Sequence, residues 1–233
     1  MKRLALDAQF LSRYAFDVSR CIQLQHLALN GWSLGLDSLP VSIASQTLIS
    51  LTLIRIDERE KFFPLLQFPQ LHTLELDDCH LPAGSTYPSP FIAHSLSITS
   101  LSLKDLKFSL KDLLALLRLL PTVTHFLFYQ YSCKGILEDF FSNLRHAHPS
   151  ESKTLFPCLT HMEMQVRFHD DEKDPVTSAF AKLVKSRVPG NQLKSVRLLV
   201  LDQCLNHDLI SSLAYLPKVG IAISIQDKCG RIL

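Results

Sequence analysis

The sequence predicts an α/β solenoid, a right-handed horseshoe in which a parallel sheet lines the concave face and helices cover the convex face. Three observations predict this fold class. One apolar spelling, L-x-x-L-x-L, recurs along the 233 residues, and most of its copies begin 23 to 27 residues apart. Between copies the apolar period changes from two residues, typical of a strand, to about three and a half, typical of a helix.

The clearest copy is the segment LHTLELDDCHL at residues 71–81. Because side chains alternate in an extended chain, Leu74 and Leu76 point to one face, while Thr73, Glu75 and Asp77 point to the other. A single such strand has an apolar side that only a neighbouring strand unit, stacked in parallel, can bury. The full spelling, L-x-x-L-x-L-x-x-C-x-L, is that of a leucine-rich repeat.

The copies place eight strands in order, and an alternating segment closes the chain as a ninth strand. The copies begin at Met1, Leu24, Leu48, Leu71, Ile98, Val123, Leu159 and Leu193, and the closing strand is Val219–Ile225. The successive intervals are 23, 24, 23, 27, 25, 36 and 34 residues, and the two long ones indicate insertions. The last copy could also begin at Val196, which would move every side chain to the other face. We expect residues 1–233 to form one leucine-rich-repeat domain.

Helices are expected between the strands, on the outer side of the solenoid. The segments with helical periodicity are Ser12–Ser19, Glu60–Gln67, Ser109–Leu120, Gly135–His146, Val176–Arg187 and His207–Tyr215. Asp174 followed by Pro175 is typical of a helix start. The polar stretches 146–154 and 168–174 are interpreted as loops. Four prolines precede strands, where each is expected to hold its predecessor in an extended conformation: Pro69, Pro121, Pro157 and Pro217.

Charge and composition narrow the classes of partner. The chain has 24 basic and 22 acidic residues and no block of five or six like charges, which gives little electrostatic support to binding nucleic acid or a membrane. The leucine-dense segment 113–120 is far shorter than the roughly 20 residues of a membrane span. No secretory signal is visible at the start. The six cysteines form no C-x-x-C pair, and we interpret most of them as reduced thiols in a cytoplasmic or nuclear protein.

The candidate binding residues lie on the face of the strands that points away from the helices. Equivalent positions of neighbouring parallel strands are about 4.8 Å apart, so these residues form columns along the concave face. The predicted partner-binding residues are His125, Leu127, Tyr129, His161, Glu163, Glu75, Asp77 and Lys104. Leu127 and Tyr129 are candidate anchors for a protein ligand, because tyrosine is enriched in interface hot spots.

The alternatives to a polar binding surface are a metal site and an enzyme active site. His125, His161 and Glu163 are expected on adjacent strands, where two imidazoles and a carboxylate could hold zinc, but no second shell is evident. No catalytic sequence motif such as G-x-S-x-G, H-E-x-x-H or a phosphate-binding glycine loop occurs, and the chain has only seven glycines. The sequence therefore predicts a non-enzymatic binding protein without a cofactor or a metal.

Divergent L-x-x-L-x-L strands with Leu-Pro or Phe-Pro before them resemble the repeat region of F-box/leucine-rich-repeat proteins. The resemblance rests on the segments FPQLHTL at 68–74, LPTV at 120–123 and FPCL at 156–159. The resemblance implies repeats that hold a substrate while an N-terminal F-box docks onto a cullin-RING ubiquitin ligase through an adaptor. Because this chain begins inside a repeat, that adaptor is an expected partner only if an F-box lies upstream.

The alternative is a free-standing leucine-rich-repeat scaffold without a role in ubiquitin transfer. The spacing of 23 to 27 residues in the N-terminal half is also similar to that of ribonuclease-inhibitor and GTPase-activating repeats. Those repeats carry an asparagine at the turn, whereas only Asn30 fits that position here.

Overall fold

The computed structural model describes residues 2–7, 20–32, 43–56, 66–80, 97–130, 135–145, 155–167, 173–188, 193–202, 204–205, 207–230 and 233. The chain divides into two compact units, which we describe one at a time. Unit 1 is Met1–Thr122, and unit 2 is Val123–Leu233. The expectation of a single domain stays a prediction.

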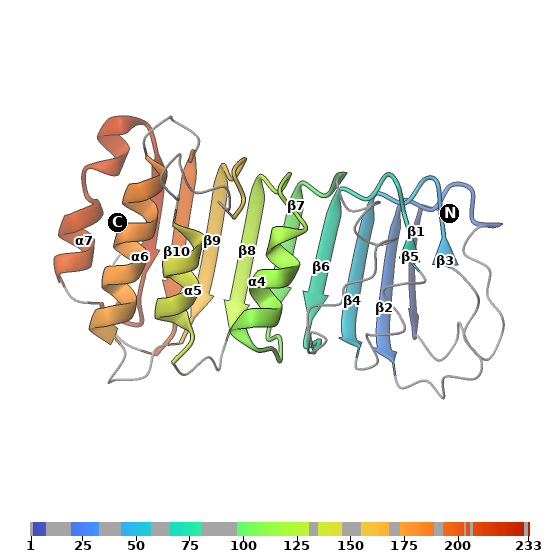
Figure 1. Cartoon of the computed structure of the whole chain (residues 1–233), viewed down its shortest axis with the longest axis horizontal. Helices are drawn as coiled ribbons and strands as arrows, with labels where there is room; N and C mark the ends of the chain where they lie inside the picture. The colour runs from blue at the N-terminus through green and yellow to red at the C-terminus, as the bar shows by residue number, and fades with distance from the viewer. Residues whose placement is uncertain are drawn as a thin grey trace. The chain divides into compact units, whose positions relative to one another are not determined.

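Unit 1 is built on five parallel strands in the order β1-β2-β4-β6-β7 (Figure 1). Their bounds are Arg3–Asp7 (β1), His26–Trp32 (β2), Ser50–Ile56 (β4), Thr73–Asp77 (β6) and Ser100–Lys104 (β7). Each strand begins two residues after the start of an L-x-x-L-x-L copy, so all five predicted strands are confirmed. The register places Leu27, Leu51, Leu74 and Leu101 in one inward row, and all four are buried.

A row of hydroxyl groups ties the strand starts of unit 1 together. The residue before the first apolar residue of a copy donates from its hydroxyl to the carbonyl of that apolar residue one strand earlier. The bonds are Thr47 to Leu24 (2.8 Å), Ser97 to Leu71 (2.7 Å) and Thr122 to Ile98 (2.9 Å). These hydroxyls provide donors for backbone carbonyls that precede the first residue of each strand. The bonds stabilise the stacking of successive strands.

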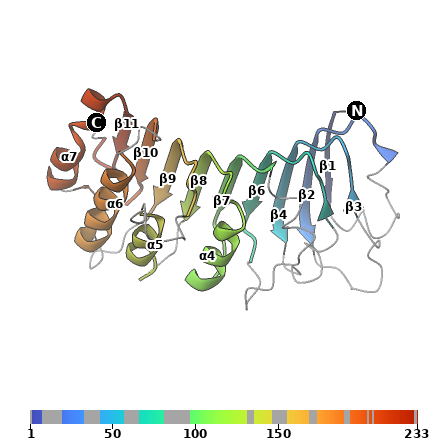
Figure 2. The ribbon, with the colours of Figure 1, turned by 45° about the horizontal axis from the view of Figure 1, so that its top comes forward.

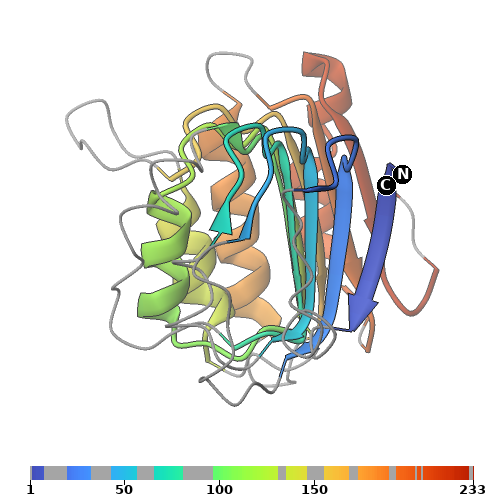
Figure 3. The ribbon, with the colours of Figure 1, turned by 90° about the vertical axis from the view of Figure 1, so that its right-hand side faces the viewer.

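Helix α4, Leu110–Arg118, confirms the helix predicted at Ser109–Leu120. Ser109 caps it, because its Oγ accepts from the amide of Asp112 at 3.2 Å and donates to the Asp112 carboxylate at 2.5 Å. Leu113, Leu116 and Leu117 are buried, and α4 lies on one side of the strands of unit 1 (Figure 3).

Two further strands of unit 1 were not predicted. Ile43–Ala44 (β3) and Leu66–Gln67 (β5) pair in parallel as a separate two-stranded sheet. The helix predicted at Glu60–Gln67 is therefore wrong at its last two residues, while residues 60–65 lie outside the described part, as does the helix predicted at Ser12–Ser19. Leu66 is buried and Gln67 is exposed, so this strand shows one step of alternation, too short for a sequence pattern.

Unit 2 has four parallel strands in the order β8-β9-β10-β11 (Figure 2). They are His125–Gln130 (β8), His161–Val166 (β9), Ser195–Val200 (β10) and Ala222–Gln226 (β11). In β10, Val196 and Leu198 are buried while Leu199 is half-buried, so the frame that begins at Leu193 is correct and the one at Val196 is wrong. The closing strand starts later than predicted, because Leu216–Val219 form the 3-10 helix η5 and Gly220 ends it with φ 81°.

The structure describes three helices in unit 2, and the first two lie in front of its strands in the view of Figure 1. They are Leu137–Leu144 (α5), Lys173–Arg187 (α6) and His207–Leu213 (α7), which confirms the three helices predicted there. Phe140, Phe141 and Phe180 are fully buried beneath them with Phe126 and Phe128 of β8. Helix α6 begins at Lys173, ahead of the predicted start at Asp174-Pro175. Among the described residues, no helix is long and apolar enough to cross a membrane.

The prolines before strands act less uniformly than expected. Phe156, which precedes Pro157, has a left-handed φ of 51° in place of the predicted extended conformation. Its carbonyl accepts from the amide of Leu159 and from Arg187, and these bonds hold the turn. Pro217 lies inside η5, so it starts a helical turn before the strand follows.

Candidate binding surface on the open sheet faces

We call the sheet face that points away from the helices of each unit its open face. On β8 and β9 the side chains alternate between buried and accessible, so the register decides which residues share that face. His125 pairs with His161, Leu127 with Glu163 and Tyr129 with Gln165. All five residues predicted to bind a partner in unit 2 therefore lie together on its open face.

The two histidines form a stacked pair. Their ring centroids are 4.1 Å apart with an angle of 5° between the planes. The Nδ1 atoms of His125 and His161 lie 2.9 and 2.8 Å from the hydroxyls of Thr124 and Thr160, respectively. The Thr160 hydroxyl donates its hydrogen to the Thr124 carbonyl, so Nδ1 of His161 must be the donor to Thr160. In this tautomer the Nε2 atom of His161 carries the lone pair and accepts hydrogen bonds.

The surroundings of His161 favour its neutral form. Burial lowers the pKa of His161 below its ordinary value, and the neighbouring His125 and Lys194 lower it further. A positive charge on His161 would also lie in direct contact with any charge on the stacked His125 ring. The neutral form of His161 is therefore favoured, and its ring presents a flat surface.

Glu163 links three strands on the same face. Its Oε1 atom accepts from the Tyr129 hydroxyl at 2.8 Å and lies 3.4 Å from Nη1 of Arg197. These contacts fix the Tyr129 ring and the carboxylate. Arg197 was not among the predicted site residues, although it pairs with Glu163 in the register of β9 and β10. The sequence allowed two starts for this strand, Leu193 and Val196, and these place Arg197 on opposite faces of the sheet.

The zinc site considered for His125, His161 and Glu163 is not supported by this geometry. Because the rings are parallel, their outer nitrogen lone pairs run side by side and do not converge on one point. Among the described residues, metal-ligand geometry occurs only at Cys204, Asp227 and Cys229.

The open face of unit 1 carries the other three predicted residues. Lys104 makes an ion pair with Glu75, whose second oxygen lies 3.4 Å from the Thr52 hydroxyl. Asp77 pairs with Lys104 in the register. Burial raises the pKa of Asp77, Lys104 opposes that rise, and nearby acidic groups, first Glu75, add to it.

A hollow of about 570 Å³ lies on the open face of unit 1, where no site was predicted. Its floor is made by small side chains, and it is lined by Arg3, Ala5, His26, Ala28, Ser50 and Thr52. The sequence shows the column of small residues. It does not show that Arg3 and His26 line the same hollow.

Of the cysteines that the structure describes, three are free thiols and two form a disulfide, while Cys133 lies outside the described residues. Cys79 is buried as predicted, and its thiol lies 3.4 Å from the Leu53 carbonyl. Cys21 and Cys158 are free thiols, but Cys204 and Cys229 form a disulfide. They meet because they follow β10 and β11, two adjacent parallel strands whose ends lie at the same sheet edge.

Comparison of the chain with protein-family models, with curated proteins and with solved structures finds no match.

Proposed function

We propose that this chain is a non-enzymatic protein-binding module, a leucine-rich-repeat solenoid that holds a protein ligand on its open face. The observation that carries the proposal is the ordered surface of unit 2, where His125, His161, Leu127 and the Tyr129–Glu163–Arg197 network share one sheet face. Parallel strands with paired registers fix these side chains before a ligand arrives. Such preorganisation reduces the entropy lost on binding.

The chemistry of this surface favours a protein ligand that combines apolar and hydrogen-bonding groups. Leu127 and the stacked rings offer apolar contact, while Nε2 of His161 and the Glu163 carboxylate accept hydrogen bonds. Arg197, whose side chain is 56% exposed, is the donor on this surface that can reach a ligand carboxylate. The mixture of aromatic anchors and a guanidinium is typical of interface hot spots.

The resemblance to F-box/leucine-rich-repeat proteins supports a more specific role as the substrate-binding part of a ubiquitin ligase receptor in the cytoplasm or nucleus. In that role the ligand is a client that is ubiquitinated. As a free-standing scaffold, the chain would bind its ligand without changing that ligand's ubiquitination. Measuring client ubiquitination in cells with and without the chain separates these two roles.

The experiment compares two variants of the full chain that carry equal numbers of substitutions. The open-face variant changes His125, Leu127, Tyr129, His161 and Glu163 to alanine. The helix-side variant changes exposed residues of α5 and α6, namely Glu138, Asp139, Ser142, Lys182 and Lys185. Proteins captured by the wild type are identified, purified and titrated against all three forms.

We expect the open-face variant to lose at least about tenfold in affinity, because each hot-spot residue contributes about 2 kcal/mol or more. The helix-side variant should bind like the wild type. Thermal unfolding of each variant checks that the fold is intact. Unchanged affinity of the folded open-face variant would contradict the proposal, as would equal losses in both variants.

A further inference from the structure

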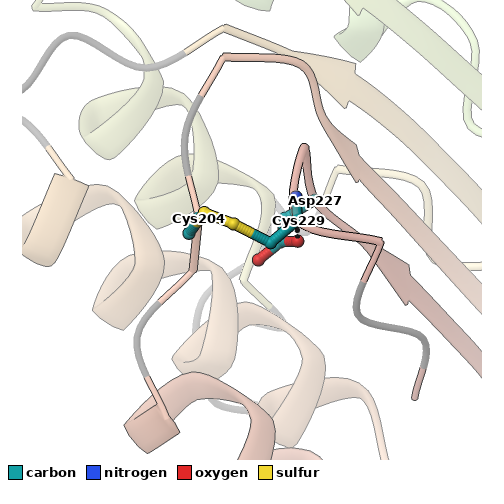
Figure 4. Close-up of side chains that lie close together, drawn as sticks. All are labelled: Cys204, Asp227 and Cys229. Atoms are coloured by element: carbon teal, nitrogen blue, oxygen red, sulfur yellow. Dashed lines mark hydrogen bonds between the residues drawn. A yellow bond between two sulfur atoms is a disulfide. The ribbon is translucent and has the colours of Figure 1, made fainter.

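The disulfide of unit 2 lies beside a buried carboxylate. Cys204 follows β10, Cys229 follows β11, and Asp227 lies between β11 and Cys229 (Figure 4). Asp227 is only 3% exposed. The two sulfur atoms and a carboxylate oxygen all lie within 4.8 Å of one another. Three side chains that can ligate a metal ion are thus gathered at one point.

Backbone groups hold the carboxylate in place independently of the sulfur–sulfur bond. Oδ2 of Asp227 accepts from the amide of Leu205 at 2.8 Å, and Oδ1 accepts from the amide of Cys229 at 2.8 Å. One bond reaches the segment that carries Cys204, and the other reaches Cys229 itself. Asp227 therefore keeps the two cysteine segments together when the disulfide is broken.

We propose that the reduced form of this cluster is a binding site for a thiophilic divalent cation, with Zn²⁺ as the best fit. The ligands are the thiolates of Cys204 and Cys229 and the carboxylate of Asp227, and water completes the tetrahedron. Zn–S and Zn–O distances of about 2.3 and about 2.1 Å place such ligands within the observed span. Two thiolates disfavour Mg²⁺ and Ca²⁺, which prefer oxygen ligands.

The amide bonds to Asp227 support metal binding because they orient the carboxylate. Each carboxylate oxygen has a second lone pair besides the one that accepts from an amide. Hydrogen bonds of this kind, made to ligands from the surrounding shell, fix ligand orientation in known metal sites. The 5.6 Å between the Cα atoms of Cys204 and Cys229 lets both side chains face a common ion after rotation about χ1.

Oxidation and metal binding exclude each other at this site. A dithiol reductant supplies two electrons and two protons, the sulfur–sulfur bond breaks, two thiols form, and the reductant becomes a disulfide. On metal binding each thiol releases its proton to solvent, and each thiolate donates an electron pair to the ion. Cys229 is exposed and Cys204 is half-buried, so a reductant can reach the bond.

The test uses Co²⁺ as a spectroscopic substitute for Zn²⁺ in the full chain. The protein is reduced, freed of reductant without oxygen and titrated with Co²⁺. We expect a sulfur-to-cobalt charge-transfer band that saturates at one ion per chain and disappears when Zn²⁺ is added. Protein left in the disulfide form should give no such band.

Variants separate this site from the other thiols. Cys204→Ser and Cys229→Ser should each remove half or more of the band, and Asp227→Asn should weaken Co²⁺ binding about 10- to 100-fold. Cys158→Ser, which changes an exposed thiol outside the cluster, should behave like the wild type. Circular dichroism confirms folding, and the serine variants retain Asp227 and its amide bonds.

Two outcomes would overturn the proposal. One is a reduced wild type without the thiolate band, which would show that the cluster is a structural disulfide only. The other is a band that survives both serine substitutions, which would place the cobalt on different thiols.

Discussion

Units 1 and 2 differ in backbone conformation at the same position of the L-x-x-L-x-L motif. We number its first apolar residue 1, so that position 8 follows the last outward residue of the strand. In unit 1 position 8 has a left-handed φ, at Gly31 (71°), Arg55 (54°), Asp78 (46°) and Asp105 (44°). In unit 2 position 8 is the last residue of a strand and is buried, at Gln130, Val166 and Val200.

This difference shows that one motif can continue in two ways after position 7. In unit 1 the left-handed residue interrupts the alternation, so β6 and β7 stop at position 7, whereas β2 and β4 continue past it and pair Trp32 with Ile56 at position 9. An extended residue adds one more inward side chain, and β8, β9 and β10 run through position 8. The buried cores differ accordingly, with leucine rows in unit 1 and a phenylalanine cluster beneath the helices of unit 2.

The largest expected effect contrasts the two cores. Phe140 lies 4.8 Å from Phe128, between ring centroids, and is fully buried, so Phe140→Ala should lower the free energy of unfolding by about 3 to 5 kcal/mol. Leu74→Ala in unit 1 should cost about 2 to 5 kcal/mol, with the smaller cavity giving the smaller loss. Urea denaturation measures both. An effect near zero at Leu74 would show that this side chain does not face the core.

The second prediction concerns Arg187 of unit 2, the one buried cation among the described residues. Arg187 is 2% exposed and donates to the carbonyls of Leu144, Leu155 and Phe156. Burial lowers its pKa to about 10, so it remains charged at neutral pH. Arg187→Met removes the guanidinium donor from all three carbonyls, of which Phe156 keeps the bond from the Leu159 amide, and should cost about 3 kcal/mol.

Lys185→Met on the same helix is the matched control for Arg187. Lys185 is exposed, so its substitution should change the free energy of unfolding by less than about 0.5 kcal/mol. If both variants unfold at the same urea concentration, Arg187 does not hold the end of α6 against α5 and the turn at Phe156.

Much of this architecture follows from the sequence because strand periodicity is a local property. Leu74 and Leu76 alternate with polar residues, and this pattern alone placed the strand starts and the outward residues, including all eight predicted site residues. The interval between copies also paired His125 with His161 before the register was known. Helices α4, α5, α6 and α7 were visible for the same reason, since their apolar residues recur at helical spacing.

Contacts between distant segments could not be predicted in this way. The Cys204–Cys229 disulfide depends on which strands are neighbours and on where each chain leaves the sheet. Arg187, in the last turn of α6, resembles an exposed residue that interacts with the helix dipole, and only packing shows it to be buried. The stacking of His125 on His161 depends on Thr124 and Thr160, which orient the rings.

The third prediction tests position 8 directly. An added Cβ at Gly31 would meet nothing within 4 Å, so the effect of Gly31→Ala comes only from the left-handed φ of 71°. This substitution should lower the free energy of unfolding by about 1 kcal/mol. Arg55→Gly should relieve similar strain but lose the bonds to Asn30, leaving a net change within about 0.5 kcal/mol. A neutral Gly31→Ala would show that the turn at position 8 is not constrained.

The smallest expected effects are opposite pH dependences of the two open faces. Because the pKa of His161 is lowered by folding, the unfolded chain binds more protons just below about pH 6.5, and this group's contribution to stability falls as the pH falls through that range. Because the pKa of Asp77 is raised, the folded chain binds more protons just above about pH 3.9, and its contribution falls as the pH rises. His161→Gln should remove the first slope, and Asp77→Asn the second, in urea midpoints measured across both ranges. If His161→Gln leaves the slope near pH 6.5 unchanged, the stacked pair does not hold His161 neutral, since the depressed pKa is the physical basis for its neutral, hydrogen-bond-accepting form.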